Sequence, residues 1–263
     1  MHEILEHLSA GMLVLDLGSS DGSFAPNATS ATIIRVDRET PVKSKGGLFV
    51  QAEASRLPFV CGAFAAVISN HSLEHFEDLL GSLREIARVL QPAGSLFVSV
   101  PDASTLTDKL YRWLSRGGGH VNAFTSSHEL IGLIERTTGI EHVASRILYS
   151  SLSFLNRRNN LNGMPRRLLF LGAGYEWSLF LYCWISRLLD RTIGTRTSVY
   201  GWALYFGFVP KKIDTEGRIN VCIRCGAGHA IVMLRRQGLV RSIASVPSLY
   251  NCPTCGALNP FCK

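Results

Sequence analysis

Residues 14–24, Val-Leu-Asp-Leu-Gly-Ser-Ser-Asp-Gly-Ser-Phe, decide the fold. An apolar run ends near Asp16, and Gly18 and Gly22 enclose a turn of small residues. A buried parallel strand is commonly followed by such a turn beside a ligand-binding crevice. Glycine lets the backbone turn tightly and approach a ligand closely. The stretch therefore predicts a ligand site at the turn, although a turn with a purely structural role has the same pattern.

A second acidic residue follows the next β-rich run. Residues 31–36 read Ala-Thr-Ile-Ile-Arg-Val, and Asp37 comes directly after them. In nucleotide-binding folds an acid at the end of the second strand binds ribose hydroxyls. The combination with the turn favours a bound nucleoside over a solvated surface Asp37.

The remaining pattern alternates apolar runs with segments of helical spacing, and this alternation is typical of a doubly wound sheet. Residues 199–209 suit a last strand that lies antiparallel to its neighbour. We therefore predict an α/β fold with a doubly wound, mostly parallel, seven-stranded sheet. The other expected elements are strands at 12–17, 31–36, 47–51, 64–69, 95–100 and 141–149, and helices at 4–8, 21–28, 79–90 and 127–138.

Composition restricts the compartment and the partners. The chain has 263 residues, seven cysteines and a formal net charge of +7. A basic chain suits an anionic partner such as nucleic acid, acidic lipid or a phosphorylated sugar. Residues 1–10 contain no apolar core of a signal peptide. We expect a cytoplasmic protein, with a peripheral membrane association as a further option.

Five sequence blocks resemble the class I S-adenosylmethionine-dependent methyltransferases of the small-molecule "type 11" family. The similarity extends over about residues 12–102, and residues 119–125 and 127–138 are similar to the second half of that family. The resemblance implies a Rossmann-like methyltransferase fold and S-adenosylmethionine as cofactor, and it does not specify the acceptor. The blocks are VLDLGSSDGSF, the VD at 36–37, AEASRLPF, AAVISNHSLEHFED and EIARVLQPAGSLFVSVPD.

The resemblance also implies roles for individual residues. The turn after the first strand would hold the methionine end of the cofactor, and the acid after the second strand would hold the ribose. Residues after the third strand would contact adenine, and residues after the fourth would lie beside the sulfonium. In that order, these residues are Asp16, Gly18, Ser20 and Gly22; Asp37; Glu53 and Ala54; and Asn70 and His71.

Three positions depart from the family pattern. Ser20 replaces the middle glycine of the first motif, and Glu53 replaces a common Asp. Ala65 replaces the Asp that usually precedes the fourth strand. These departures motivate one alternative, a binding protein on a degenerate methyltransferase fold.

Methyl transfer from a sulfonium mainly requires the acceptor and donor to be held in line. A hydroxyl acceptor also requires a general base. The candidates for this catalytic role are His71, His75 and His120. His75 suits a structural hydrogen bond at a helix start equally well, and His120 follows three glycines in a segment that could close over a site.

Residues 151–197 form an insertion between the last two predicted strands. The insertion begins with a basic segment, and residues 168–189 are mostly apolar. About 20 apolar residues can span a bilayer, but Glu176 lies near the centre of this run. Three interpretations stay open: a packed lid or dimer helix, an interfacial helix that contacts the membrane surface through residues 166–189, and a transmembrane span.

The C-terminal tail contains two CxxCG motifs. Each brings two thiolates to one point, and four thiolates form a closed tetrahedral structural zinc site. The segment between the motifs is expected to form a hairpin of residues 230–234 and 239–245. Paired redox dithiols are the alternative, and His229 and Cys262 are spare ligands. The predicted zinc ligands are Cys222, Cys225, Cys252 and Cys255.

We therefore predict a methyltransferase domain at residues 1–212 and a zinc-ribbon-like domain at residues 213–263. The favoured function is methylation of a small molecule or of a glycan or lipid-linked acceptor. The second is RNA methylation, with the ribbon as an RNA-binding appendage. Ser69-Asn70-His71-Ser72 lacks the Asn/Asp-Pro-Pro-Tyr-like motif typical of base N-methylation, which argues against nucleic acid. The third is the non-catalytic binding protein.

Overall fold

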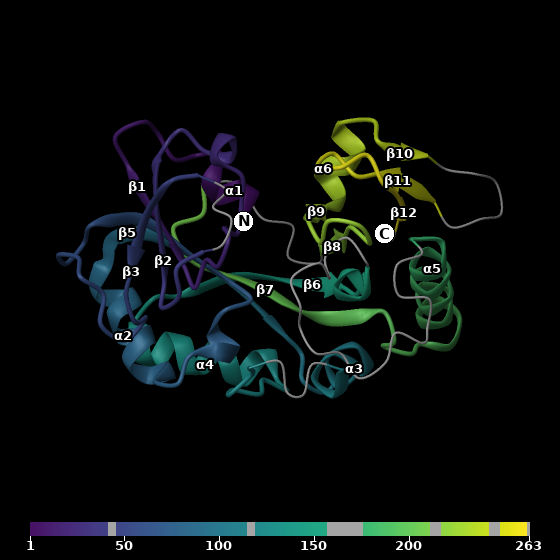
Figure 1. The fold of residues 1–263 in the computed structure, drawn as a ribbon, viewed down its shortest axis with the longest axis horizontal. Coiled ribbons are helices and arrows are strands. Elements are labelled where there is room, and N and C mark those ends of the chain that lie inside the picture. Colours follow the sequence, from purple (N-terminus) through teal and green to yellow (C-terminus); the bar gives the residue numbers. More distant parts are fainter. Residues whose placement is uncertain (42–45, 115–118, 157–175, 211–216, 242–247, 262–263) are drawn as a thin grey trace. The chain divides into compact units, whose positions relative to one another are not determined.

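The computed structural model describes residues 1–41, 46–114, 119–156, 176–210, 217–241 and 248–261. The chain forms two compact units (Figure 1). The compact units do not follow the predicted boundary between residues 212 and 213, because the tail and residues 146–201 are in one unit. Unit 1 comprises Met1–Pro101, Val121–Ser145 and Trp202–Thr215, and unit 2 comprises Asp102–His120, Arg146–Gly201 and Glu216–Lys263.

Unit 1 contains the parallel sheet that the sequence predicts. Its strands follow the order β3-β2-β1-β4-β5, and each neighbouring pair is parallel. The order reverses between β1 and β4, and ligands of such sheets bind at the carboxyl ends of the strands on either side of this reversal. The strands are β1 (Leu13–Leu17), β2 (Thr32–Asp37), β3 (Leu48–Gln51), β4 (Phe64–Asn70) and β5 (Leu90–Pro101).

Two further strands follow β5 in the order β7-β6, and both continue into unit 2. They are β7 (Val199–Gly207) and β6 (His142–Tyr149). Buried side chains of the sheet and of its helices form a hydrophobic core, as expected where a sheet is covered by helices. Leu15, Val67 and Leu204 are among its fully buried members.

Two amphipathic helices of unit 1, α2 (Leu79–Val89) and α4 (Ser127–Thr138), contact each other (Figure 1). The side chain of Asp78 caps α2 by accepting a hydrogen bond from the Gly81 N–H at 2.9 Å. Ser126 caps α4 through the Glu129 N–H, and these caps satisfy N–H groups that have no partner within the helix.

The predicted helix at 21–28 is wrong. Only Pro26–Ala28 is helical, as the short 3₁₀ segment η1. The Ser23 N–H donates to Asp16, and the Phe24 carbonyl accepts from Arg35, so side chains bind the backbone groups that a helix would use. The other short elements of unit 1 are α1 (His2–Leu5) and η2 (Leu73–His75).

Unit 2 enlarges the sheet beyond the seven strands predicted, to nine. Strand β8 pairs parallel with β6 through Ile147–Arg218 and Leu148–Ile219, and β9 pairs antiparallel with β8. A separate three-stranded sheet has the order β10-β11-β12. These strands are β8 (Arg218–Val221), β9 (Gly228–Ala230), β10 (Val240–Arg241), β11 (Leu249–Asn251) and β12 (Leu258–Pro260).

The hairpin predicted between the CxxC motifs is also wrong in its first arm, because Ile231–Arg236 forms helix α6. Leu234 is buried in the small core of the tail, and Ile231, three residues before it, packs against the same core, as the spacing of a helix face allows. Residues 242–245 of the second arm are outside the described residues. The other helices of unit 2 are α3 (Leu106–Leu114), η3 (Ser153–Leu155) and α5 (Glu176–Ile193).

Helix α5 occupies most of the described part of the predicted insertion, residues 151–197. Residues 168–175 of the apolar run lie outside the described residues. Among the helices that the structure describes, none combines the length and the apolar character that a membrane crossing requires.

Candidate functional site

The turn after β1 is held by a buried ion pair. Asp16 on β1 and Arg35 on β2 are direct neighbours in the parallel register, and both side chains are at most 1% exposed. Arg35 Nη1 donates to Asp16 Oδ2 at 2.5 Å, and Arg35 Nη2 donates to the Phe24 carbonyl at 2.8 Å. The pair therefore fixes the backbone of residues 23–24, and Asp16 supports the turn from inside the protein.

The sequence reasoning missed Arg35. A charged residue in the otherwise apolar run Ile33-Ile34-Arg35-Val36 was the available signal, because a buried charge requires a partner. Asp16 lies opposite it once the two strands are paired.

The two glycines of the turn have no room for a side chain. A Cβ on Gly18 would lie 2.4 Å from Ser72 Cβ, and one on Gly22 would lie 2.1 Å from Arg35 Nη1. Both residues also have positive φ angles, 66° and 116°. Gly22 is therefore required by the buried Arg35, whereas Gly18 lets the turn approach the segment after β4.

Asp37, at the end of β2, lies beside the same turn. Its Oδ2 accepts a hydrogen bond from the Ser20 N–H at 2.8 Å, and its Oδ1 accepts one from the Glu39 N–H at 3.1 Å. Ser20 adopts φ 45°, a conformation that glycine adopts more readily. The Asp37 carboxylate is thus oriented by two N–H groups while its side chain stays partly exposed.

Glu53 and Ala54 follow β3, the next strand in the sheet. Glu53 is exposed, whereas Ala54 is buried in the core of unit 1. The Ala52 N–H donates to the Asp37 carbonyl at 3.1 Å, which places the start of this segment beside the end of β2. An exposed carboxylate here is available to a ligand bound over the strand ends.

Asn70 ends β4, and His71 follows it directly. The Ser99 hydroxyl donates to Asn70 Oδ1 at 2.8 Å, and the His71 N–H donates to the Ser99 carbonyl at 2.9 Å, so β5 orients both residues. His71 adopts φ 55° and its Nδ1 lies 3.8 Å from Glu74 Oε1. Although 31% of the side chain is exposed, Nδ1 itself is buried. Burial, together with His75 nearby, lowers the pKa of His71 to about 4.

Comparison with known proteins agrees with this geometry. Residues 15–98, from β1 to β5, match the family model described as Methyltransferase domain. The malonyl-[acyl-carrier protein] O-methyltransferase of Halorhodospira halophila is 26% identical over 256 residues, covering 85% of this chain and 82% of that protein. The demethylmenaquinone methyltransferase of Mycolicibacterium vanbaalenii is 44% identical over 62 residues, 24% of this chain and 26% of that protein.

The chain is an S-adenosylmethionine-dependent methyltransferase. Solved structures show the same fold at low identity. The YcgJ protein from Bacillus subtilis has a TM-score of 0.50 at 19% identity, covering 76% of this chain and 92% of that one. A proposed methyltransferase from an antibiotic biosynthesis pathway of Anabaena variabilis has a TM-score of 0.51 at 15% identity, covering 78% and 94%.

The other two histidines suggested by the sequence lie in different units of the methyltransferase. His75 ends the η2 segment of unit 1. His120 belongs to unit 2, where its Nδ1 is 3.5 Å from Asp108 Oδ1 and its ring centroid is 5.2 Å from that of Tyr111. Asp108 is fully buried and also accepts a 2.5 Å hydrogen bond from Arg112. Burial raises the pKa of Asp108, and Arg112 opposes this shift.

The tail brings the four predicted cysteine ligands together. Their sulfur atoms all lie within 4.8 Å of one another, with Cys222 and Cys255 at 3.6 Å and Cys225 and Cys252 at 3.7 Å. A tetrahedral site with Zn–S bonds of about 2.3 Å has sulfur atoms about 3.8 Å apart. The sulfur cluster therefore has the spacing required to hold one zinc-sized ion.

Polar groups surround the sulfur cluster. The Arg224 N–H donates to Cys222 Sγ at 3.4 Å, and Asn259 Nδ2 donates to the same sulfur at 3.5 Å. His229 Nε2 lies 3.2 Å from Cys252 Sγ, so this histidine contacts the cluster from the side. Hydrogen bonds of this kind stabilise thiolate charge. Cys262, the other spare ligand, lies outside the described residues.

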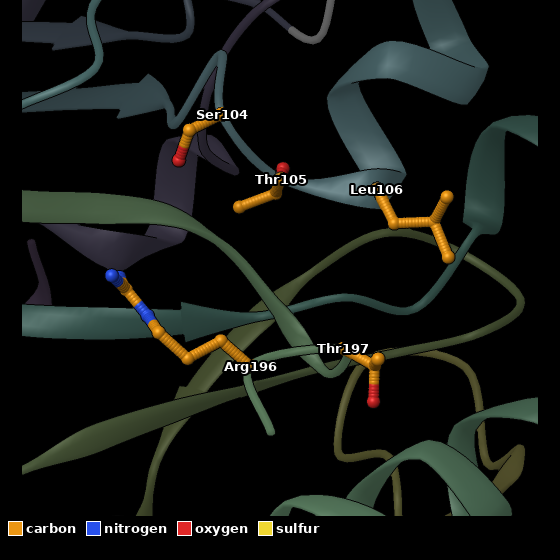
Figure 2. Close-up of a pocket in the computed structure, with 5 residues that line it drawn as sticks. All are labelled: Ser104, Thr105, Leu106, Arg196 and Thr197. Carbon is orange, nitrogen blue, oxygen red and sulfur yellow. The ribbon is translucent and has the colours of Figure 1, made fainter. Parts of the chain in front are cut away.

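A shallow pocket lies at the start of α3 (Figure 2). Its volume is about 310 Å³. Arg196 on one side is 3.5 Å from the buried Asp102 carboxylate, so the guanidinium is already partly neutralised. The pocket offers hydroxyl groups and one arginine to a polar ligand. Its lining residues are Ser104, Thr105, Leu106, Arg196 and Thr197.

Proposed function

We propose that the protein transfers a methyl group from S-adenosylmethionine to a small molecule, or to a glycan or lipid-linked acceptor. The observation that carries this proposal is the methyltransferase-domain match, which contains the β1 turn, the acid of β2, the end of β4 and most of β5. The H. halophila relative, named for action on a carrier-bound malonyl group, supports an acceptor outside nucleic acids.

In this proposal the cofactor lies over the carboxyl ends of β1, β2 and β4. Gly18, Ser20 and Gly22 provide the turn that holds its methionine end, and Asp37 accepts hydrogen bonds from the ribose hydroxyls. Glu53 and Ala54 contact the adenine. Asn70 and His71 lie beside the sulfonium, and Asp16 supports the turn through Arg35.

The cofactor supplies an activated methyl group, so the protein mainly positions the acceptor. His71, His75 and His120 are the proposed general bases for a hydroxyl acceptor. His71 stays neutral at physiological pH, since its pKa lies at about 4, and can accept a proton only weakly. The buried Asp108 lies 3.5 Å from Nδ1 of His120 within unit 2 and would orient that imidazole.

We propose further that Cys222, Cys225, Cys252 and Cys255 bind a structural Zn²⁺. The sulfur spacing supports this assignment, and a closed four-thiolate site leaves no position for catalysis. Reduced thiols also favour a cytoplasmic location over a secreted one. Redox dithiols are the alternative, and metal analysis distinguishes the two.

Titration calorimetry with S-adenosylmethionine tests the function. Binding at micromolar cofactor is expected, and a protein that binds neither this cofactor nor S-adenosylhomocysteine would be a non-catalytic relative. The acceptor class follows from incubating cell extracts with labelled cofactor. Label in the lipid, polysaccharide or small-molecule fraction supports the proposal, whereas label in RNA supports the RNA methyltransferase alternative.

A further inference from the structure

Helix α5 presents an unusual exposed face. Five of its six exposed apolar side chains are between 37% and 70% exposed, and their spacing of mostly four residues places them on one side of the helix. The described residues on this side include a single charged side chain at its border, Arg191. These residues, which we name the α5 face, are Trp177, Leu181, Ile185, Leu188 and Leu189.

The opposite side of α5 already attaches the helix to unit 2. Leu179 and Cys183 belong to a buried cluster with Ile223 of the tail. The buried Arg187 donates to the Pro260 carbonyl, and its guanidinium lies 4.9 Å from the Tyr149 ring centroid. Arg187 therefore points inward, and the contacts that attach α5 to unit 2 lie on the side opposite the α5 face.

Charge differs sharply between the two units. The sequence of unit 2 contains 17 Lys and Arg but only five Asp and Glu, a net charge of +12. Unit 1 contains ten basic and 15 acidic residues, a net charge of −5. The four acids of unit 2 that the structure describes all have partners within that unit, such as Arg224 for Glu176 and the Ser198 hydroxyl for Asp190.

We infer that the α5 face docks unit 2 onto an anionic lipid surface. Tryptophan and leucine side chains insert at the boundary between headgroups and acyl chains, and basic residues add attraction to acidic lipids. The helix would lie along the surface, in keeping with its amphipathic and partly charged sequence.

Two other occupants fit less well. Leucine and isoleucine give an RNA phosphate no hydrogen bond, and single-stranded RNA is bound by aromatic rings interleaved with basic groups. A symmetric dimer through the α5 face would bring two copies of a unit with a net charge of +12 together, which self-repulsion opposes. An anionic bilayer satisfies the apolar and the basic features together.

Co-sedimentation of the full chain with vesicles tests the inference without any methyl transfer. Vesicles of phosphatidylcholine with about 30% phosphatidylserine are compared with phosphatidylcholine alone. The test variant is Trp177→Gln/Leu181→Gln/Ile185→Gln. The matched control is Val60→Gln/Val232→Gln/Leu258→Gln, which changes three exposed apolar residues outside α5.

We expect the wild type and the control to bind the anionic vesicles at least about tenfold more strongly than the neutral ones, with weaker binding in 0.5 M NaCl. The α5 variant should bind at least about tenfold more weakly at an unchanged melting temperature. Equal binding by the α5 variant, or failure of the wild type to sediment, overturns the inference. Two other results would also overturn the inference, if vesicle binding is absent. The first is a wild-type dimer that the α5 variant dissociates, and the second is RNA binding by the wild type that the α5 variant abolishes.

Discussion

Arg35 and Asp16 form an ion pair of 2.5 Å between neighbouring parallel strands, and solvent reaches at most 1% of either side chain. Arg35 also donates to the Phe24 carbonyl and to that of Gly46. One guanidinium thus connects β1, the turn that follows it and the segment before β3. The turn after β1 has its shape because this pair is buried beneath it.

Arg35→Met should lower the free energy of unfolding by about 3–5 kcal/mol, because it leaves the buried Asp16 carboxylate without its charged partner. Denaturant unfolding gives the value. Arg38→Met removes an exposed arginine of the same strand region and should cost less than about 0.5 kcal/mol. Equal costs for the two variants would contradict the structural role of the pair.

Asp37→Asn should weaken S-adenosylmethionine binding by at least about tenfold, since it removes a charged acceptor for the ribose hydroxyls. Its free energy of unfolding should change by less than about 1 kcal/mol, because the side chain is partly exposed. Calorimetry and denaturant unfolding measure the two effects. Glu39→Gln is the control, with the same loss of charge on an exposed neighbour. Unchanged affinity in Asp37→Asn would refute the ribose assignment.

Because of His71, the free energy of unfolding should depend on pH in the acid range. Its pKa falls from 6.5 to about 4 on folding, so the unfolded chain binds more protons between these values. Its contribution is therefore present above pH 6.5 and is lost as the pH falls toward 4. His71→Asn, which tolerates the positive φ, should reduce this slope in unfolding curves recorded across the range.

The control for this experiment is His128→Asn, which removes an exposed imidazole from α4. A slope that is the same in the wild type and in His71→Asn would show that His71 is not the group responsible.

Cys252→Ser should reduce bound zinc from one equivalent to well below it, because a structural site of four thiolates loses a ligand. Metal content is measured by mass spectrometry, and protection of the tail by hydrogen exchange. Exposure of residues 248–261 to exchange is expected, with the β1–β5 sheet unchanged. Cys61→Ser changes an exposed cysteine and should retain the metal. A wild-type protein that is purified without metal but keeps a protected tail would rule out the zinc site.

Arg224 connects the first cysteine motif to the start of α5, through hydrogen bonds of 2.6 Å to both carboxylate oxygens of Glu176. Both side chains are 27–29% exposed. The coupling energy in a double-mutant cycle of Arg224→Gln and Glu176→Gln should be about 0.2–1 kcal/mol. A coupling energy of zero would mean that the contact does not contribute to holding α5 on the tail.

Apart from residues 21–28, the strand and helix pattern of residues 12–102 could be predicted from the sequence, because the local signals there agree with the fold. Apolar runs predict β1, β2 and β4, and the periodicity at 79–90 predicts α2. The two CxxC motifs likewise determined which four sulfurs meet. The failures fall at residues 21–28 and 231–236, where side chains distant in sequence decide the backbone.

The sequence by itself therefore determined the glycine turn after β1, the position of Asp37 at the end of β2 and the four cysteines that meet, because spacing along the chain specifies them. Only the tertiary structure decided that Asp16 forms an ion pair with Arg35, since that contact arises from the register of β1 against β2. It also decided which side of α5 is exposed. Hydropathy of residues 176–193 does not reveal that Arg187 points inward while Trp177 and Ile185 point outward, because the tail supplies the partners of the buried side.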